Sequence, residues 1–336
     1  MEGRTKNEWD IILSQDIYVY GAAKTAERIY NFLSERGGRV KGFLVTEGKD
    51  NPLQLLGLPV EDIHIFKNKE ACILVPHMGT YKEEIVRLLE SLGFMNVHLT
   101  AQLIARTMLE ENKDHDPSLN VCEDKNDRHS GIRKQVLDIL HEGLPDFGGV
   151  MPYQSLEMIG LKGGRPTEKR MEEYGLKEIL RPEDDVLDIG CNSGFFDILV
   201  AQFVHSVTGV EYDKSLVRVG ELVRDYLEVP NCAFYNGDFK DWHKQTNMKF
   251  DVIFSFAIHH WLNLSPEEYV TILDGLLREE GYICFESHIY GMDAEADECR
   301  KKLREMGYQI VCDKRVSDGA AEEREYILFK KYPVNN

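Results

Sequence analysis

Glycines and acidic side chains follow strand-like runs in the second half of this 336-residue chain. The apolar run that begins at Asp185 passes through Asp188 into a turn that contains Gly190 and Gly194, and then opens a helix. Glycines in such a turn allow a tight bend and a close approach of the backbone to a ligand. This pattern indicates a ligand site at the carboxyl end of a buried strand.

A second strand-like run ends in Glu211, 17 residues after Gly194. A carboxylate at that place can accept hydrogen bonds from both hydroxyls of a ribose. Alternatively, Glu211 has no ligand and is simply a solvated carboxylate at the end of a strand. A third run ends in Asp238, just after an Asn-Gly pair that is itself a good turn former.

Histidines follow two later runs of the same series. His259 and His260 come after the run 250–256, and Glu286 and His288 come after the next one. All four fall at carboxyl ends of expected parallel strands, where open sheets place ligands, so they could converge. Imidazoles there could serve as a general base or hold a divalent metal. We expect substrate contact from His260 and His288, a packing role for His259, and no metal.

The elements that must position these residues form two βα series. In the first hundred residues, strand-like runs at 17–20, 39–45, 71–75 and 96–99 alternate with helical runs at 25–35 and 82–92. The second series begins beyond residue 181. Alternation of this kind predicts parallel βαβ units, and therefore two α/β domains.

The stretch between the two series has a different character. Residues 109–130 are polar and contain Pro117, which predicts a linker. Helical runs at 132–141 and 167–180 then predict a helical adaptor or lid over 131–180, with Thr167 as an N-cap. The expected boundaries are thus 1–108 for the first domain, 109–130, 131–180, and 181–336 for the second domain.

From about residue 150 to 332 the chain resembles class I S-adenosylmethionine-dependent methyltransferases. The resemblance rests on four motifs in the family's order: VLDIGCNSG, the acidic end of the following strand, NGDF, and FDVIFSF. It implies a doubly wound sheet and S-adenosyl-L-methionine as the cofactor. Asp188 and Gly190 would line its methionine half, Glu211 would hold the ribose, and Asp238 would accept from the adenine amino group with Phe239 against the ring.

The segment before the first motif would act as a lid over the cofactor, as in related methyltransferases. Arg170 could then meet the cofactor's carboxylate through a forked pair of hydrogen bonds, although Glu168, Glu172 and Glu173 around it also suit a solvated helix face. The complete set of expected cofactor-binding residues is Tyr153, Gln154, Arg170, Asp188, Gly190, Asn192, Gly194, Phe195, Glu211, Tyr212, Asp238, Phe239 and Ser255.

Two other cofactor or acceptor classes fit poorly. A nicotinamide dinucleotide site would show Gly-x-Gly-x-x-Gly, whereas Asn192 stands between the two glycines here. Amino-group methylases usually carry Asn/Asp-Pro-Pro-Tyr/Phe after the fourth strand, and residues 255–258 read Ser-Phe-Ala-Ile. An oxygen or carbon acceptor is therefore favoured over an amino group.

The first domain resembles the small Rossmann-like domain at the front of some sugar-modifying enzymes of surface-polysaccharide pathways. The residues that carry this resemblance are VYGAAKTA, VKGFLV, GLPV and SLGFMNV, between positions 19 and 97. Ala23 and Ala26 stand where full dinucleotide sites place glycines, so a working NAD site is not expected. Docking of a nucleotide sugar or acceptor and a purely structural role both remain open.

Charge narrows the range of partners. Forty basic residues against 58 acidic ones give a net charge of −18, which argues against broad nucleic-acid binding. No run approaches a membrane span of about 20 apolar residues, and the seven cysteines never form CxxC. We therefore expect a cytoplasmic protein that uses a small-molecule or sugar acceptor and contacts neither nucleic acid nor membrane. Its oligomeric state is left open.

The interpretation that these patterns favour is methyl transfer from S-adenosylmethionine to an oxygen, or a carbon, of a sugar or another small metabolite. One alternative is an RNA methyltransferase, which would use the basic run Lys162, Arg165, Lys169, Arg170, Lys177 and Arg181. The other is a non-catalytic, cofactor-binding scaffold or regulatory protein.

Overall fold

The computed structural model divides the chain into two compact units, residues 1–107 and 108–336. The structure describes residues 8–22, 24–46, 51–76, 81–100, 103–104, 127–143, 152–288, 290–291, 293–317 and 323–332. The expected linker at 109–130 lies outside the described residues up to position 126, and so does Ala23.

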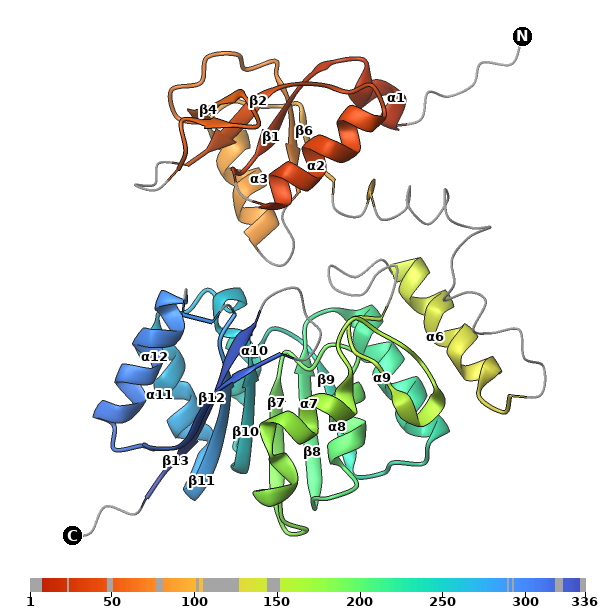
Figure 1. Cartoon of the computed structure of the whole chain (residues 1–336), viewed down its shortest axis with the longest axis vertical. Helices are drawn as coiled ribbons and strands as arrows, with labels where there is room; N and C mark the ends of the chain where they lie inside the picture. Colours follow the sequence, from red (N-terminus) through yellow and green to blue (C-terminus); the bar gives the residue numbers. More distant parts are fainter. Residues whose placement is uncertain are drawn as a thin grey trace. The chain divides into compact units, whose positions relative to one another are not determined.

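The first unit is built on a six-stranded sheet in the order β3-β4-β2-β1-β5-β6 (Figure 1). Every pair is parallel except β3–β4. The strands are β1 (Asp16–Tyr20), β2 (Arg39–Val45), β3 (Gln54–Leu55), β4 (Leu58–Asp62), β5 (Cys72–Val75) and β6 (Val97–Leu99). Four of these were expected from the sequence; β3 and β4 were not.

Helices cover both faces of this sheet, because alternate strand residues point to opposite sides. Val19 and Phe43 face α1 and α2, whereas Tyr20 and Leu44 face the side that carries α3. The helices are α1 (Glu8–Leu13), α2 (Lys24–Glu35) and α3 (Tyr81–Ser91). The α/β, Rossmann-like prediction for this unit is confirmed.

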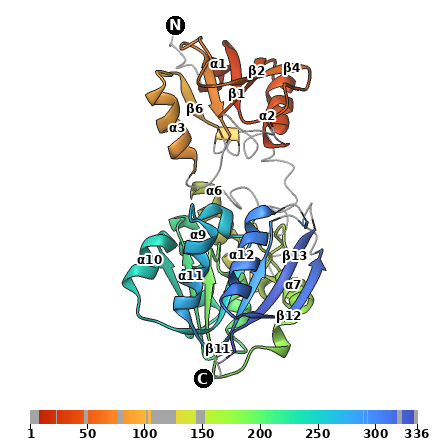
Figure 2. The same ribbon diagram turned by 90° about the vertical axis from the view of Figure 1, so that its left-hand side faces the viewer.

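The second unit contains a seven-stranded sheet in the order β12-β13-β11-β10-β7-β8-β9 (Figures 1 and 2). Six strands run in the same direction, and only β13, between β11 and β12, is antiparallel to its neighbours. The strands are β7 (Asp185–Ile189), β8 (Ser206–Glu211), β9 (Cys232–Asn236), β10 (Phe250–Phe256), β11 (Leu277–Glu286), β12 (Gln309–Val316) and β13 (Arg324–Lys330).

Two layers of helices enclose this sheet, which is therefore doubly wound as expected. One apolar core joins the strands to α7, α8 and α9, and the other joins them to α10, α11 and α12. Figure 1 shows α11 and α12 on one side of the sheet and α7 and α8 on the other. The helices are α8 (Phe195–Val200), α9 (Lys214–Tyr226), α10 (Phe239–Gln245), α11 (Pro266–Leu276) and α12 (Ala294–Glu305). No described helix is long and apolar enough to cross a membrane.

The expected helical adaptor is part of this same unit. Its helices are α6 (Ser130–Gly143), which packs against α9, and α7 (Thr167–Tyr174), which packs against α8. Two short 3-10 turns, η1 (Glu157–Ile159) and η2 (Leu176–Glu178), flank α7. The second expected helix stops at Tyr174 because Gly175 adopts φ of 67° and caps it.

The N-cap prediction at Thr167 is wrong. Pro166 occupies the cap position of α7, and no side chain accepts a hydrogen bond there. The Thr167 hydroxyl instead donates to the Ser155 carbonyl oxygen and lies 3.1 Å from a Glu157 carboxylate oxygen. Thr167 therefore closes the loop 155–167 on itself instead of capping the helix.

Two glycines of this unit give opposite predictions for the same substitution. A Cβ on Gly209 of β8 would stand 2.7 Å from the Cys191 sulfur and 2.9 Å from the Phe234 ring, whereas a Cβ on Gly275 of α11 would meet nothing within 4 Å. We expect Gly209→Ala to lower the free energy of unfolding by about 1–3 kcal/mol through overpacking. Gly275→Ala should raise it by about 0.5–1 kcal/mol through helix propensity. Urea unfolding of both variants tests this, and equal shifts would contradict the packing at Gly209.

Candidate functional site

The turn between β7 and α8 forms the centre of the site. Gly190, Asn192 and Gly194 all have positive φ, of 71°, 56° and 65°. A Cβ on Gly190 would collide with Ile258, and one on Gly194 with the Phe234 ring. Gly190 and Gly194 are therefore required both for the backbone path and for the space around it, as the sequence predicted.

Glu211 ends β8 beside this turn. Its side chain is buried, with the residue only 7% exposed, so the solvated-carboxylate alternative is wrong. The backbone N–H groups of Asn192 and Asp213 donate to its two oxygens at 3.0 and 2.9 Å. Burial raises the pKa of Glu211 to about 7. Since each oxygen accepts only one of these bonds, each retains an acceptor position for a ligand hydroxyl.

Asp188 lies on β7 next to a second buried acid that the sequence analysis did not single out. Asp197, on α8, is fully buried, and neither of its carboxylate oxygens has a hydrogen-bond partner among the described residues. Burial raises the pKa of Asp188 to about 6, and burial together with the Asp188 charge raises the pKa of Asp197 well above its usual range. These two buried carboxyl groups thus disfavour each other's ionised form.

Asp238 and its neighbours lie beyond the ends of β8 and β9. Asp238 is the N-cap of α10 and accepts from the Lys240 N–H at 2.8 Å, while its side chain stays 34% exposed. Tyr212 is 41% exposed. Phe239 is buried and stacked on Trp242, with ring centroids 6.1 Å apart. Asp238 and Tyr212 are thus accessible to a ligand, whereas the Phe239 ring belongs to the core.

Three other predicted residues are buried in different surroundings. Ser255, on β10, is fully buried, and its hydroxyl pairs with the Tyr269 hydroxyl at 2.8 Å. That contact faces α11, on the opposite side of the sheet from Asp188. Phe195 is fully buried in the core beneath α8. Gln154 is also buried, and its Oε1 atom has no hydrogen-bond partner among the described residues.

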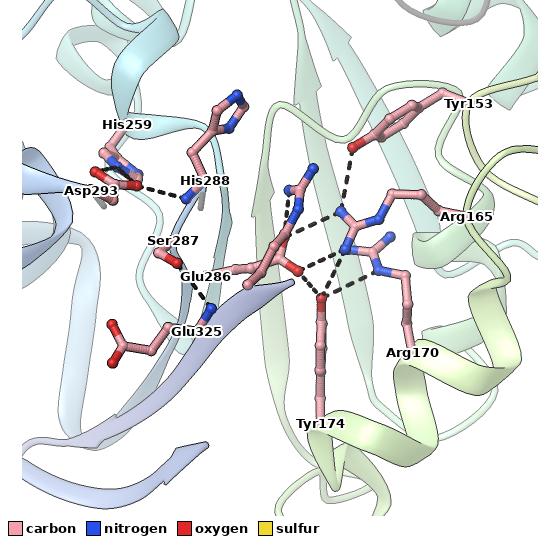
Figure 3. Close-up of polar contacts among 11 residues, drawn as sticks. Tyr153, Arg165, Arg170, Tyr174, His259, Glu286, Ser287, His288, Asp293 and Glu325 are labelled. Carbon is pink, nitrogen blue, oxygen red and sulfur yellow. Dashed lines mark hydrogen bonds and ion pairs between the residues drawn. The ribbon is translucent and has the colours of Figure 1, made fainter. Parts of the chain in front are cut away.

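A network of ion pairs around Glu286 ties the segment before the glycine motif to the sheet (Figure 3). Arg165 forms a forked pair with Glu286 at 2.7 and 3.2 Å, and Arg324 of β13 adds a third contact at 3.1 Å. The Tyr174 hydroxyl also donates to Glu286, and Arg165 donates to the Tyr153 hydroxyl at 3.3 Å. Burial would raise the pKa of Glu286, but the arginine charges outweigh it and lower the pKa to about 2.

Arg170 enters the same region from α7. It is 1% exposed, and its guanidinium lies 4.9 Å from the Phe196 ring centre and 5.4 Å from that of Phe256. The solvated-face alternative is therefore wrong. Because Arg165 and Arg170 are both buried, two of the six cations in the basic run are withdrawn from any surface that RNA phosphates could reach.

The histidines converge on an acid that was not predicted, Asp293. His259 lies with Nε2 at 3.2 Å from both Asp293 oxygens, and His260 lies with Nε2 at 3.0 Å from one of them. His260 also places Nδ1 at 2.8 Å from Glu295, and the hydrogen bond with Asp293 raises the pKa of His260. Glu286 does not join this group, because it points to the arginines on the other side of β11 (Figure 3).

His288 follows β11 and stands beside His260, with ring centroids 5.5 Å apart. Its backbone N–H donates to Asp293 at 2.6 Å, but no described carboxylate pairs with its ring. Burial, and then the Arg324 charge, lower the pKa of His288 to about 4. Its Nδ1 is buried without a partner among the described residues. The lowered pKa keeps the His288 ring uncharged at neutral pH, with a ring nitrogen that no described residue engages.

The residues present fit an adenosyl cofactor. The Ser193 hydroxyl, in the glycine turn, and Gln154 Oε1, in the preceding segment, are buried polar atoms that lack partners among the described residues. Glu211 keeps acceptor capacity for hydroxyls, and the glycines leave room for a ligand against the backbone. Buried polar groups that lack a protein hydrogen-bond partner normally bind a ligand or an ordered water instead.

Several residues of the site were not predicted from the sequence. Arg165, Tyr174 and Arg324 act through contacts that span up to 121 positions in the chain, which no local pattern announces. Asp293 does carry a local signal, because it stands directly before the helical run 294–305 and caps it. Asp197 lies three positions after Gly194 within an otherwise apolar run, and a lone acid there is a visible anomaly.

The Glu286 network gives a stability prediction. Glu286→Gln leaves Arg165 and Arg324 buried without their counter-charge, so we expect the free energy of unfolding at pH 7 to fall by about 3–5 kcal/mol. The exposed Glu267, paired with Lys302 at 3.0 Å, provides the control, and Glu267→Gln should cost about 0–1 kcal/mol.

The pH dependence follows from the lowered pKa of Glu286. Its stabilisation is complete above its ordinary pKa of 4.5 and is lost as the pH falls toward about 2. The difference between wild type and Glu286→Gln in urea unfolding should therefore shrink as the pH falls below about 4.5. A difference that stays constant down to pH 3 would contradict this assignment.

Comparison with known proteins supports the sequence resemblance. Residues 180–327 match a family described as a methyltransferase domain. A protein-L-isoaspartate O-methyltransferase from Klebsiella pneumoniae is 30% identical over 135 residues, which cover 40% of this chain and 58% of that enzyme. A cobalt-precorrin-6B C(15)-methyltransferase (decarboxylating) from Methanococcus maripaludis is 30% identical over 92 residues, 26% of this chain and 49% of that protein. The chain thus spans about half the length of the curated relatives that it matches.

Among solved structures, an S-adenosylmethionine-dependent methyltransferase from Aquifex aeolicus aligns with a TM-score of 0.38 at 16% identity, over 50% of this chain and 90% of that one. The family match covers every strand from β7 to β12 and reaches into β13. Residues 180–327 of the second unit are therefore a methyltransferase domain, and the glycine turn, the strand-end acid and the sheet order agree with the resemblance to class I S-adenosylmethionine-dependent methyltransferases.

Proposed function

We propose that this protein transfers the methyl group of S-adenosyl-L-methionine to an oxygen of a sugar or another small metabolite. The observation that carries the cofactor part is the buried Glu211, whose oxygens are held by two backbone N–H groups beside the glycine turn. The acceptor part rests on a neutral imidazole at the neighbouring strand end. Among the relatives, one enzyme name states transfer to oxygen and another to carbon.

In this proposal the cofactor lies across the carboxyl ends of β7, β8 and β9. Glu211 accepts from the ribose hydroxyls, and Asp238 is near enough to solvent to meet the adenine amino group. Gln154 and Ser193 supply polar atoms whose hydrogen bonds are incomplete among the described residues. Arg170 and the Glu286 network hold the segment 152–174 as a lid across that edge.

S-adenosylmethionine supplies an activated methyl group, whose carbon–sulfur bond breaks with its electron pair passing to sulfur. The acceptor hydroxyl must lose its proton as the new carbon–oxygen bond forms. His288 Nδ1 has no hydrogen-bond partner within the described part of the chain and can take that proton, whereas both ring nitrogens of His260 already face carboxylates. We therefore assign proton removal to His288 and a supporting role to His260. The rest of the rate comes from holding the reacting atoms in line.

The cofactor assignment predicts a measurable loss of affinity. Glu211→Ala should weaken binding of S-adenosylhomocysteine by at least about tenfold, because hydrogen bonds to a charged group are worth about 1.5–3 kcal/mol. Glu221→Ala, which removes an exposed acid from α9, is the control and should leave binding unchanged. Isothermal titration calorimetry measures both, and equal affinity in wild type and Glu211→Ala would remove Glu211 from the site.

The raised pKa of Glu211 also predicts that the affinity for S-adenosylhomocysteine depends on pH. Because the pKa of Glu211 is raised to about 7, its carboxylate is the better acceptor only above that pH. Wild-type affinity for S-adenosylhomocysteine should therefore rise between pH 6 and pH 8, and the rise should vanish in Glu211→Ala.

The acceptor assignment is tested with radiolabelled S-adenosylmethionine and fractionated cell extract. We expect label in a small, ribonuclease-resistant, carbohydrate-like fraction. His288→Ala should reduce the rate of labelling by about 100-fold or more, as loss of a general base does, while S-adenosylhomocysteine binding stays unchanged. His243→Ala, on α10, serves as the histidine control. Label in large material that ribonuclease dissolves would overturn the small-acceptor proposal.

A further inference from the structure

His259, His260 and Asp293 form a compact group, which we call the His–Asp cluster. The two histidines begin the 3-10 turn η3 (His259–Trp261) that follows β10, and Asp293 caps α12 after β11. Because β10 and β11 are parallel neighbours, these segments meet at the carboxyl edge of the sheet. Figure 3 shows Asp293 directly beside His259.

The distances within the cluster suit a shared ion. One potential ligand atom from each residue lies within 4.8 Å of the others. The two imidazole Nε2 atoms stand 3.2 and 3.0 Å from Asp293 oxygens. Metal–ligand bonds of about 2.0–2.2 Å place neighbouring donor atoms about 3 Å apart around a common ion.

Backbone N–H groups hold the Asp293 carboxylate in position, independently of the His259 and His260 side chains. Asp293 accepts the backbone N–H of Ala296 on one oxygen at 3.0 Å and that of His288 on the other at 2.6 Å. A carboxylate has about four acceptor positions, so one on each oxygen remains toward the imidazoles. Two backbone bonds therefore fix the group while leaving donor capacity for a third partner.

Contacts with other residues also orient the His259 and His260 rings. His260 has its Nδ1 atom 2.8 Å from a Glu295 oxygen, which is the outer carboxylate contact that metal-binding histidines commonly make. His259 is 4% exposed, and its ring stacks on Phe285 at 5.1 Å. Both rings thus present Nε2 to the same place.

We propose that the His–Asp cluster binds one divalent transition-metal ion. Two imidazole nitrogens and one carboxylate oxygen suit zinc, iron, cobalt or manganese, whereas magnesium and calcium prefer sites made of oxygen alone. From the sequence we expected no metal, and Asp293 was not among the candidate residues. If the proposed function holds, the ion would lie at the acceptor end of the site, beside His288.

Cobalt(II) provides the probe, because its visible absorption reports the ligand set. The full chain, freed of metal by a chelator, should bind one Co²⁺ per chain with a ligand-field spectrum. Asp293→Asn keeps a capping side chain on α12 but removes the charge, and should lower Co²⁺ affinity at least about tenfold. His260→Gln and Glu295→Gln should lower it by about 10–100-fold.

His205→Gln is the matched control. His205 also pairs with a carboxylate, that of Asp185 at 2.8 Å, but it is 71% exposed and lies at the opposite edge of the sheet. Its removal should leave Co²⁺ binding unchanged. Circular dichroism and S-adenosylhomocysteine binding, measured on the same samples, show whether each variant is folded.

Two results would overturn the proposal. One is a folded wild-type chain that binds no stoichiometric Co²⁺, which would leave the His–Asp cluster as a proton-sharing hydrogen-bond group. The other is equal Co²⁺ affinity in wild type, Asp293→Asn and His260→Gln. Because S-adenosylhomocysteine binding is measured separately, loss of the metal proposal would leave the methyltransferase proposal standing, and the reverse also holds.

Discussion

The buried carboxylate of Glu286 is the constraint on which the arrangement of the second unit depends. It ends β11 on the side of the sheet away from the His–Asp cluster, and it is bound by Arg165, Tyr174 and Arg324. A buried charge must be paired, so the segment before the glycine motif has to stay against the strand ends. The same contacts fix β13 beside β11. One residue thereby links the segment 152–174, strand β11 and the antiparallel strand β13.

The alternation of side chains along the strands divides the chemistry between the two faces of the sheet. Asp188 and Glu286 point toward α7 and α8, where the acid pair and the arginines lie. Phe285, next to Glu286, points the other way and supports the His259 ring. Neighbouring positions on β11 therefore contact two different groups of polar residues, and the alternation of the strand keeps these groups on opposite faces of the sheet.

The glycine turn and the strand-end acid could be predicted from short stretches of the sequence. Gly190, Gly194 and Glu211 sit where the sequence placed them, because a tight βα turn and a strand-end acid depend on neighbours in the chain. Ser255 was placed correctly on its strand, but its hydroxyl meets Tyr269, a contact that requires the packing of α11. The network around Glu286 joins residues up to 121 positions apart, and their partnership follows only from the completed sheet.

In our proposal the second unit binds an adenosyl cofactor against the β7–α8 turn, with the ribose on Glu211. A crystal structure of the full chain with S-adenosylhomocysteine would show where the cofactor lies. We expect both ribose hydroxyls within hydrogen-bonding distance of the Glu211 oxygens and the sulfur directed toward the edge that carries His288. Cofactor density elsewhere, or a ribose held by other groups while Glu211 keeps only its backbone partners, would contradict the account.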